Sequence, residues 1–321
     1  MGHRGAGAAT LMVSPQFEKV RRILSERRAA SPPSMDVVEL RRRLSEGALP
    51  AGDDVTAEMI MLGGVPAERV TASNARTDRA ILYAHGGGFC QGSPLTHRKL
   101  AGDLSRATGA VCFVVDYRLA PEHPLPAGVD DMVDAYRGLL QTHPAPTVLF
   151  AGDSAGGALV LLAATRLTSA QLPMPAGIVA ITPWLDYECT GPVATERPEV
   201  DPIVNVAELR NYQKWFLGRY AATDPAVSPL HADFHGFPPI LIHGGTGDVL
   251  CDDAAALAAR ARAANVDVTY REAPEMVHVW HVFAGRVPEA TEAVEEIGAF
   301  ARRCFGEEPP RSPDAKPTSA E

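Results

Sequence analysis

Residues 152–156 read Gly-Asp-Ser-Ala-Gly, and a further glycine follows at position 157. The mostly apolar residues 147–151 before this pentapeptide predict a short buried strand. The Ala- and Leu-rich residues 158–167 after it predict a helix. A strand that turns this sharply into a helix requires small neighbours and leaves the hydroxyl of Ser154 exposed at the head of the helix. The sequence therefore predicts a nucleophile elbow with Ser154 at its tip.

A base and an orienting acid are expected downstream, because a serine hydroxyl is a poor nucleophile at neutral pH without them. Residues 239–243 predict a strand, and Asp248 follows it after a glycine-rich loop. Residues 266–271 alternate as in a strand and lead into the loop of His278. The separation of 30 residues (278 − 248) leaves room for one helix, expected over 254–263, and that strand. The chain order serine, aspartate, histidine suits this elbow, so His278 is the expected base and Asp248 the expected acid.

The oxyanion donors are expected upstream of the elbow. Residues 80–84 predict a strand that ends in His-Gly-Gly-Gly-Phe at 85–89. Glycines carry no side chain that would block a backbone N–H from a substrate oxygen. Taken alone, such a run could equally be a flexible turn. Beside a serine elbow it favours an oxyanion hole built from Gly87, Gly88 and the residue after the nucleophile, Ala155.

Other residues compete for these roles. His281 lies three residues beyond His278, which is preferred because it directly follows the loop expected after the last strand. Asp252 and Asp253 compete with Asp248, but both precede a helical run and fit the N-cap and first turn better.

Two more acidic residues are expected to have no catalytic role, and the histidines are expected to bind no metal. Asp116 and Glu122 are expected to be structural partners of Arg118 and of loop amides. Ten histidines raise the question of a metal site, but no Cys-x-x-Cys pair accompanies them. No metal and no cofactor are therefore expected.

Together these motifs resemble those of the bacterial hormone-sensitive-lipase family of α/β-hydrolases. The resemblance covers residues 55–304 and is carried by the runs at 85–89, 116–124, 152–157, 228–230 and 247–250 and by the loop of His278. It implies an α/β-hydrolase fold, in which a mostly parallel central sheet has helices on both faces and a helical cap. It also implies that Ser154, Asp248 and His278 are the catalytic triad and that His85 holds its own loop in place.

The order of the expected elements divides the chain. Helical spacing predicts helices over 16–28 and 35–46, and strands alternate with helices from about residue 57, which implies a mostly parallel sheet covered on both faces. The segment 187–222 interrupts this alternation. We therefore expect the following parts: a disordered N-terminus over 1–14, cap helices over 15–54, a catalytic domain over 55–186 and 223–306, a second cap segment over 187–222 and a disordered tail over 307–321.

Aromatic residues of the expected cap and of the glycine-rich loop are candidates for the substrate pocket. A lid that restricts water needs apolar surface. The alternative is that these aromatics pack the core of the cap. The candidates are Phe17, Phe89, Tyr212, Trp215 and Phe216.

Composition limits the partners. The formal net charge of −9 makes nucleic acid an unsuitable partner, and the absence of an apolar run of about 18 residues predicts no membrane span. Five scattered cysteines favour a reducing compartment, here the cytoplasm, over a disulfide framework. A homodimer stays open beside a monomer.

The expected activity is hydrolysis of a carboxylic ester through an acyl-enzyme intermediate. The resemblance implies small uncharged esters with short or medium acyl chains. A lactonase, an amidase, a deacetylase of a secondary metabolite and an acyltransferase are alternatives with the same attacking machinery. A non-catalytic small-molecule receptor, as in the plant gibberellin receptors, is a further alternative, but those receptors have lost the histidine.

Overall fold

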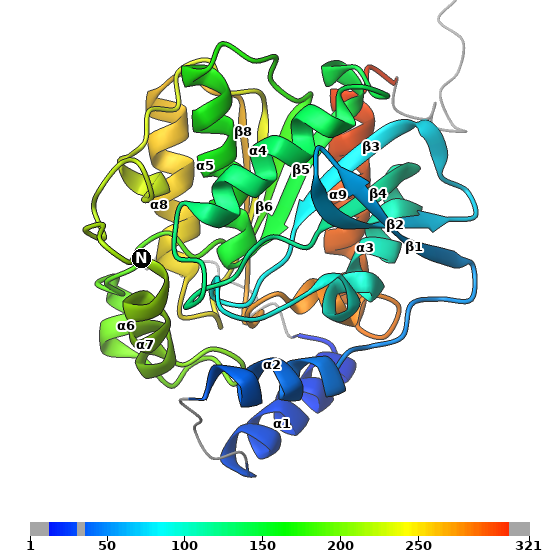
Figure 1. Cartoon of the computed structure of the whole chain (residues 1–321). Coiled ribbons are helices and arrows are strands. Elements are labelled where there is room, and N and C mark those ends of the chain that lie inside the picture. The colour runs from blue at the N-terminus through cyan, green and yellow to red at the C-terminus, as the bar shows by residue number, and fades with distance from the viewer. Residues whose placement is uncertain (1–12, 31–35, 308–321) are drawn as a thin grey trace, which may run out of the picture.

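A computed structural model of the chain describes residues 13–30 and 36–307, and an eight-stranded sheet forms its centre (Figure 1). The strands lie in the order β1-β2-β4-β3-β5-β6-β7-β8. β3 to β8 pair in parallel, whereas β2 pairs antiparallel with both β1 and β4. The bounds are β1 Val55–Leu62, β2 Val65–Ala72, β3 Arg76–Ala84, β4 Ala110–Val115, β5 Val148–Asp153, β6 Gly177–Ile181, β7 Ile240–Gly245 and β8 Val268–Ala273. The expected mostly parallel sheet is confirmed.

Helices cover both faces of this sheet, as expected (Figure 1). Side chains of α4, α5 and α8 join one buried cluster, and those of α3 and α9 join a second one. Within the described residues, no helix is both long and apolar enough to cross a bilayer. The bounds are α3 Pro94–Thr108, α4 Ala127–Leu139, α5 Ala155–Ser169, α8 Cys251–Ala263 and α9 Pro288–Cys304.

The first three strands follow one another without a helix, so the expected alternation from residue 57 is wrong at its start. β1 and β2 form a hairpin whose last pair is Leu62 with Val65. The two residues between them, Gly63 and Gly64, have φ of 56° and 88°. Two-residue hairpin turns need positive φ at their centre, which glycine adopts without strain. The run of expected helices and strands begins only after this hairpin.

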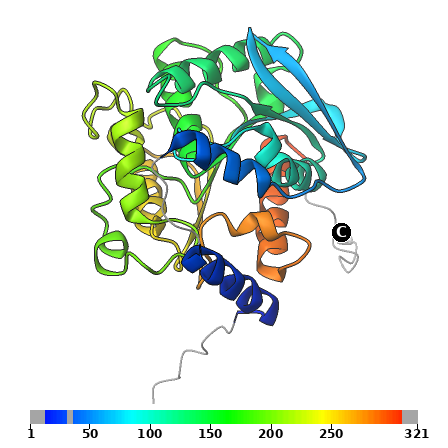
Figure 2. The ribbon, with the colours of Figure 1, turned by 60° about the horizontal axis from the view of Figure 1, so that its bottom comes forward.

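Four further helices lie at the end of the sheet where the parallel strands finish (Figures 1 and 2). They are α1 Pro15–Ala30, α2 Val37–Glu46, α6 Pro192–Glu196 and α7 Val206–Phe216. α1 and α2 agree with the helices expected over 16–28 and 35–46, although Met35 lies outside the described residues. So do residues 1–12 and 308–321, on which most of the ends expected to be disordered (1–14 and 307–321) fall. The prediction is wrong for Ser14 and Glu307, which bond to Glu289 and to Arg79.

The N-terminal helices are attached to the rest of the chain by polar contacts between distant residues. In α1, Arg28 pairs with Glu208 of α7 at 3.1 Å. Just before α1, Ser14 Oγ donates to Glu289 of α9 at 2.8 Å, across 275 residues of sequence. In α2, Arg41 pairs with Glu122 at 2.7 Å. Each helix is therefore fixed to a different part of the fold.

Gly298→Ala is expected to destabilise the protein at the contact between α9 and α3. A Cβ at Gly298 would lie 2.4 Å from the carbonyl oxygen of Ala107, so the two helices would have to separate. Alanine favours a helix over glycine by about 1 kcal/mol, yet overpacking of this kind costs about 1–3 kcal/mol. Urea denaturation should show a lower free energy of unfolding, while Glu295→Ala at an exposed position of α9 serves as control. Unchanged or raised stability of Gly298→Ala would contradict this account.

Candidate active site

Ser154 stands in a strained turn between β5 and α5. Its backbone has φ 53° and ψ −122°, a region that residues other than glycine rarely occupy. The turn is possible because two glycines allow close backbone contact: a Cβ at Gly156 would lie 2.0 Å from the carbonyl oxygen of Ala84, and one at Gly152 would lie 2.4 Å from that of Gly156. This strand, turn and helix have the geometry of a nucleophile elbow.

The structure brings Asp248 and His278 together. Asp248 lies in the loop after β7, and its Oδ2 is 2.8 Å from Nδ1 of His278. Its Oδ1 accepts the N–H of Leu250 at 2.9 Å, which fixes the carboxylate. Both side chains are buried. Because Nδ1 of His278 faces the carboxylate, Nε2 is the nitrogen left to act as a base.

The charges around His278 favour its protonated form. Burial lowers the pKa of the imidazole, but Asp248, Asp201 and Asp153 together raise it above its ordinary value. A buried imidazolium is thus stabilised by carboxylates, as a base that takes a proton in a transition state requires. Asp248 has the largest such effect, through both its charge and its hydrogen bond.

The glycine-rich loop after β3 presents free backbone donors. Gly87 and Gly88 have φ of 121° and 61°, and a Cβ at Gly88 would lie 2.5 Å from the ring of Tyr212. In the described part of the chain, the N–H groups of Gly87 and Gly88 make no hydrogen bond. Ala155 is the first residue of α5, where backbone N–H groups have no acceptor within the helix. The three expected oxyanion donors therefore lie beside Ser154 with open N–H groups.

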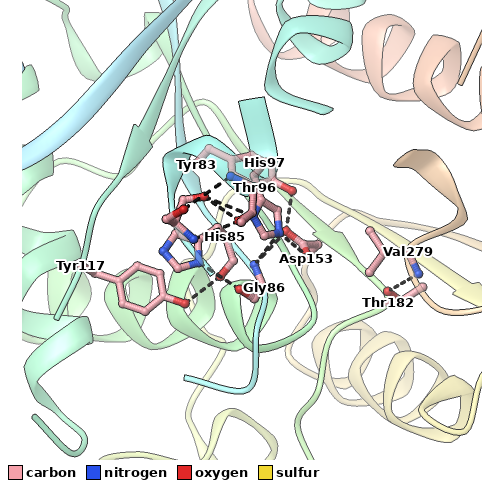
Figure 3. A network of polar contacts seen from close by, with 10 residues as sticks. Tyr83, His85, Gly86, Thr96, His97, Tyr117, Asp153, Thr182 and Val279 are labelled. Atoms are coloured by element: carbon pink, nitrogen blue, oxygen red, sulfur yellow. Dashed lines mark hydrogen bonds and ion pairs between the residues drawn. The ribbon is translucent and has the colours of Figure 1, made fainter. Parts of the chain in front are cut away.

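Asp153 ties this loop to the elbow (Figure 3). Its carboxylate accepts the hydroxyl of Tyr83 at 2.6 Å and the N–H of Gly86 at 3.0 Å. Nε2 of His97 also lies near, 3.4 Å from Oδ2 of Asp153. Burial raises the pKa of Asp153, but the charge and hydrogen bond of His97 and the hydroxyl of Tyr83 lower it overall. The ionised carboxylate of Asp153, the residue before Ser154, therefore bonds to the loop that carries the expected oxyanion donors.

His85 is placed as the resemblance implies. Its ring stacks on Tyr117 at a centroid distance of 4.2 Å, and the Tyr117 hydroxyl donates to its carbonyl oxygen at 2.7 Å. Its Nδ1 lies 2.9 Å from the carbonyl oxygen of Gly86. Burial lowers the pKa of His85 to about 3, so the ring is neutral.

A cavity of about 320 Å³ opens beside Ser154 and His278. Its wall comes from the C-terminal part of α2 and the loop after it, from the start of α3, and from α7. The apolar lining residues are Leu44, Leu49, Leu100, Ile203, Val204, Leu209, Val279 and Val282. Most of this surface is apolar, which suits the uncharged part of a substrate.

Of the five expected pocket aromatics, Tyr212 lines this cavity. The other four do not belong to its lining, because they are used in packing. Phe17 is fully buried in the cluster shared with α3 and α9. Phe89 and Phe216 pack on each other at a ring distance of 4.4 Å, and Trp215 packs on Tyr212 at a ring distance of 5.9 Å. The alternative that these aromatics serve in packing describes the four better, although Phe17 and Phe216 pack against the catalytic domain and do not form a core of the cap alone.

The competing acids and the second histidine have other partners. His281 is buried, and its Nε2 shares a hydrogen bond with Nδ1 of His243 at 2.8 Å. Asp253 accepts the N–H groups of Leu185 and Asp186, and Asp252 accepts that of Val193. Both aspartates lie in the first turn of α8, as expected, but neither is its N-cap, which is Leu250. None of the three contacts the His278 ring.

The structure corrects the expected partners of Arg118. Its guanidinium pairs with Asp131 of α4 at 2.8 Å, and its N–H donates to the same carboxylate. Glu122 instead pairs with Arg41, and Asp116 is exposed. The side chain of Asp131 is buried under the Arg118 turn, a position that the sequence pattern did not reveal.

One histidine spacing typical of metal sites was overlooked in the sequence: His231 and His235 are four residues apart. In the structure Nδ1 of His231 bonds to Ser228 and that of His235 to Asp233, so the two rings have separate partners. Across residues 13–30 and 36–307, no three His, Cys, Asp or Glu side chains are grouped to hold a metal ion.

Sequence reasoning also missed Asp201 and His97. Asp201 lies between α6 and α7, where no local pattern marks it, and its Oδ2 accepts the N–H of His278 at 2.8 Å. His97 lies in the first turn of α3, and its Nε2 lies 3.4 Å from Oδ2 of Asp153 and 3.2 Å from the backbone nitrogen of Gly86. A helix prediction over α3 would have revealed His97, because its first turn directly follows the glycine-rich loop.

A sheet of this topology with a serine elbow at the end of its fifth strand defines an α/β-hydrolase. Residues 81–282 match the sequence model of a protein family that is described as having the α/β-hydrolase fold. An acetyl-hydrolase of Streptomyces hygroscopicus is 39% identical over 303 residues, covering 92% of this chain and 99% of that protein. An esterase from the bacterial hormone-sensitive lipase family has a solved structure that is 40% identical, with a TM-score of 0.88 over 92% of this chain and 100% of its own. The chain belongs to this hormone-sensitive-lipase family of α/β-hydrolases.

The pair His243–His281 is expected to make stability depend on pH. Burial lowers the pKa of His243 to about 3 and that of His281 well below its ordinary value, so both are neutral in the folded protein. In the unfolded chain each imidazole takes up a proton near pH 6.5. The contribution of the pair to stability is therefore complete above about pH 6.5 and is lost as the pH falls from there towards about 3.

His281→Phe tests this dependence. The difference in unfolding free energy between wild type and variant, from urea denaturation, should be largest above pH 7 and narrow at pH 5. His123→Phe, at an exposed position, controls for the loss of an imidazole. A difference that is constant between pH 8 and pH 5 would contradict the assignment of a neutral buried pair.

Proposed function

We propose that this protein is a serine carboxylesterase that hydrolyses small uncharged esters through an acyl-enzyme intermediate. The observation that carries the proposal is the joint position of Ser154, His278 and the Gly87–Gly88 donors on one largely apolar cavity. Relatives support the ester chemistry. They include an esterase of Acinetobacter venetianus, which is 34% identical over 254 residues, 78% of this chain and 84% of that protein.

Each group has a role in the proposed reaction. His278 takes the proton of the Ser154 hydroxyl through Nε2, while Asp248 orients the ring through Nδ1 and stabilises the imidazolium. The oxygen of Ser154 attacks the ester carbonyl, and the N–H groups of Gly87, Gly88 and Ala155 receive the oxyanion. His278 then protonates the leaving alcohol, and water, activated by the same base, releases the acid from Ser154.

The proposed substrates have short or medium acyl chains. The cavity of about 320 Å³ accommodates a small ester, and its leucines and valines suit an alkyl chain. Esters of this size are used with related proteins: a crystal of EstE5, with 39% identity and a TM-score of 0.87, was soaked in p-nitrophenyl butyrate. The name of the Streptomyces hygroscopicus relative, an acetyl-hydrolase, adds acetyl groups to the proposed range.

We also propose that residues 15–54 and 187–222 act as a cap on the catalytic domain of residues 55–186 and 223–306. Residues of both cap segments line the cavity at Ser154, which supports a role in shaping it. The five cysteines are free, which supports a reducing compartment such as the cytoplasm.

Replacement of the triad residues tests the chemistry. Ser154→Ala should lose about 10⁶-fold in turnover of p-nitrophenyl acetate, as in other triad enzymes. His278→Ala should be nearly inactive as well. His281→Ala should keep a substantial fraction of wild-type turnover, because its ring bonds to His243 and not to Asp248. Retention of a tenth of the wild-type activity by folded Ser154→Ala would contradict the proposal. Higher turnover in His278→Ala than in His281→Ala would show that His281, and not His278, is the base.

Leu209→Ala should shift the preference for acyl-chain length. Leu209 lines the cavity, and an apolar side chain contributes about 1.5–3 kcal/mol when it is fully buried. The specificity constant for an octanoyl ester should therefore fall about tenfold or more, with a much smaller change for an acetyl ester. Leu217→Ala is the matched control, since Leu217 is buried at the end of α7 but outside the lining. Equal losses of Leu209→Ala on acetyl, butyryl and octanoyl esters would show that Leu209 supports the fold and not the chain-length preference.

A further inference from the structure

Asp201 is a buried carboxylate in the second cap segment, and its side chain reaches the loop of the candidate base. It lies between α6 and α7 and is 5% exposed. Its Oδ2 accepts the N–H of His278 at 2.8 Å. Its Oδ1 accepts the N–H groups of Ile203 at 2.6 Å and Val204 at 3.2 Å. One side chain therefore bonds to both the cap segment and the His278 loop.

The turn closed by Oδ1 of Asp201 is also part of the substrate wall. Ile203 and Val204, whose N–H groups it receives, line the cavity beside Ser154. Asn205 follows and caps α7 by accepting the N–H of Ala207 at 2.8 Å. A substitution of Asp201 would therefore affect both the cavity wall and the His278 loop.

The backbone of the His278 loop needs such restraints. Val279 has φ 47°, which is strained for a β-branched residue. Its N–H donates to Oγ1 of Thr182 at 3.3 Å (Figure 3). Strained backbone persists only where surrounding contacts impose it. Asp201 at His278 and Thr182 at Val279 restrain two successive residues of this loop.

Asp201 also acts on the charge of His278. Asp201 bonds to the backbone N–H of His278, while Asp248 bonds to Nδ1 of its ring. Burial and the nearby charge of Asp248 raise the pKa of Asp201 to about 7, and His278 and the N–H donors oppose this rise. In turn, Asp201 is one of the carboxylates that raise the pKa of His278. When Asp201 is ionised, its negative charge favours the imidazolium that forms when the base takes a proton, and the imidazolium in turn lowers the pKa of Asp201.

We propose that Asp201 is a positioning residue that fixes the His278 loop relative to Ser154 and couples it to the cap wall on which the substrate lies. This inference rests on the proposed function. Asp201 touches no reacting atom and transfers no proton, so its effect is transmitted through the backbone and charge of His278.

Two variants separate the contacts of Asp201. In Asp201→Asn one oxygen becomes an amide nitrogen, which cannot accept, so either the turn or the His278 contact is lost. In Asp201→Ser the hydroxyl can still close the local turn but is too short to reach His278. The matched control is Asp224→Asn, because Asp224 closes a turn on the N–H of Ala226 at 2.9 Å in the loop after α7.

Both Asp201 variants should lose about 10–100-fold in kcat for an acetyl ester, as expected for a misplaced catalytic group. KM should change little, because the acetyl ester makes few contacts with the cap wall. Asp224→Asn should keep wild-type kcat. Wild-type kcat in both Asp201 variants would overturn the proposal.

The pH dependence separates positioning from simple support of the fold. Loss of the Asp201 charge lowers the pKa of His278, so the acid limb of kcat/KM should move to lower pH in Asp201→Asn. Titration of the His278 imidazole by NMR, assigned with His278→Ala, should show the same shift without any substrate. If the His278 titration is unchanged and only Tm is lowered, Asp201 has a structural role and the proposal is wrong. The same conclusion follows if neither variant folds.

The NMR titration also distinguishes this inference from the proposed function. Wild-type protein that hydrolyses no ester would defeat the proposed function alone. The Asp201 inference would then fail only if the His278 titration were also unchanged in Asp201→Asn.

Discussion

The close contact between the start of α5 and the end of β3 is the constraint on which the site depends. With glycine at 156, the backbone of α5 approaches the carbonyl oxygen of Ala84 so closely that no side chain fits between them. This contact sets where the Ser154 turn lies and, because Gly86 follows β3 by two residues, how far it is from the oxyanion loop. Asp153 then joins the two through the N–H of Gly86. The nucleophile and the oxyanion donors are thus positioned by backbone packing, before any substrate binds.

The cap region is attached in a different way. Its elements contact the catalytic domain through buried aromatic side chains, such as Phe17 and Phe216, and through polar ones, such as Arg41 and Asp201, while Arg28 joins the two cap segments to each other. The ion pairs of Arg28 and Arg41 are partly exposed, and surface ion pairs contribute about 0–1 kcal/mol each. Asp201 is the buried exception. The position of the cap on the catalytic sheet is therefore determined by buried aromatic packing together with a small number of polar contacts.

The sequence predicted what local chain geometry determines. Strand, turn and helix around Ser154, the glycine run before Phe89, and the order of Asp248 and His278 are encoded within short stretches, and the structure places them as these stretches indicate. Contacts between distant segments were predicted poorly. Phe17 has a helical pattern that says which face is apolar but not which partner covers it, and it packs with α3 and α9. Asp131 and Asp201 could not be found because their burial results from tertiary packing alone.

The bond between Ser14 and Glu289 has a consequence for biosynthesis. The first cap helix leaves the ribosome before the rest of the described fold, yet the Glu289 that anchors the residue before it belongs to α9, which also contributes to the cluster around Phe17. Domains fold as their segments emerge, from the N-terminus onward. The first strands of the sheet can pair early during synthesis, whereas α1 must wait for Glu208 of α7 and then for Glu289 of α9 before its polar contacts are complete. Among the described elements, α1 is thus synthesised first but is one of the last to reach its final contacts.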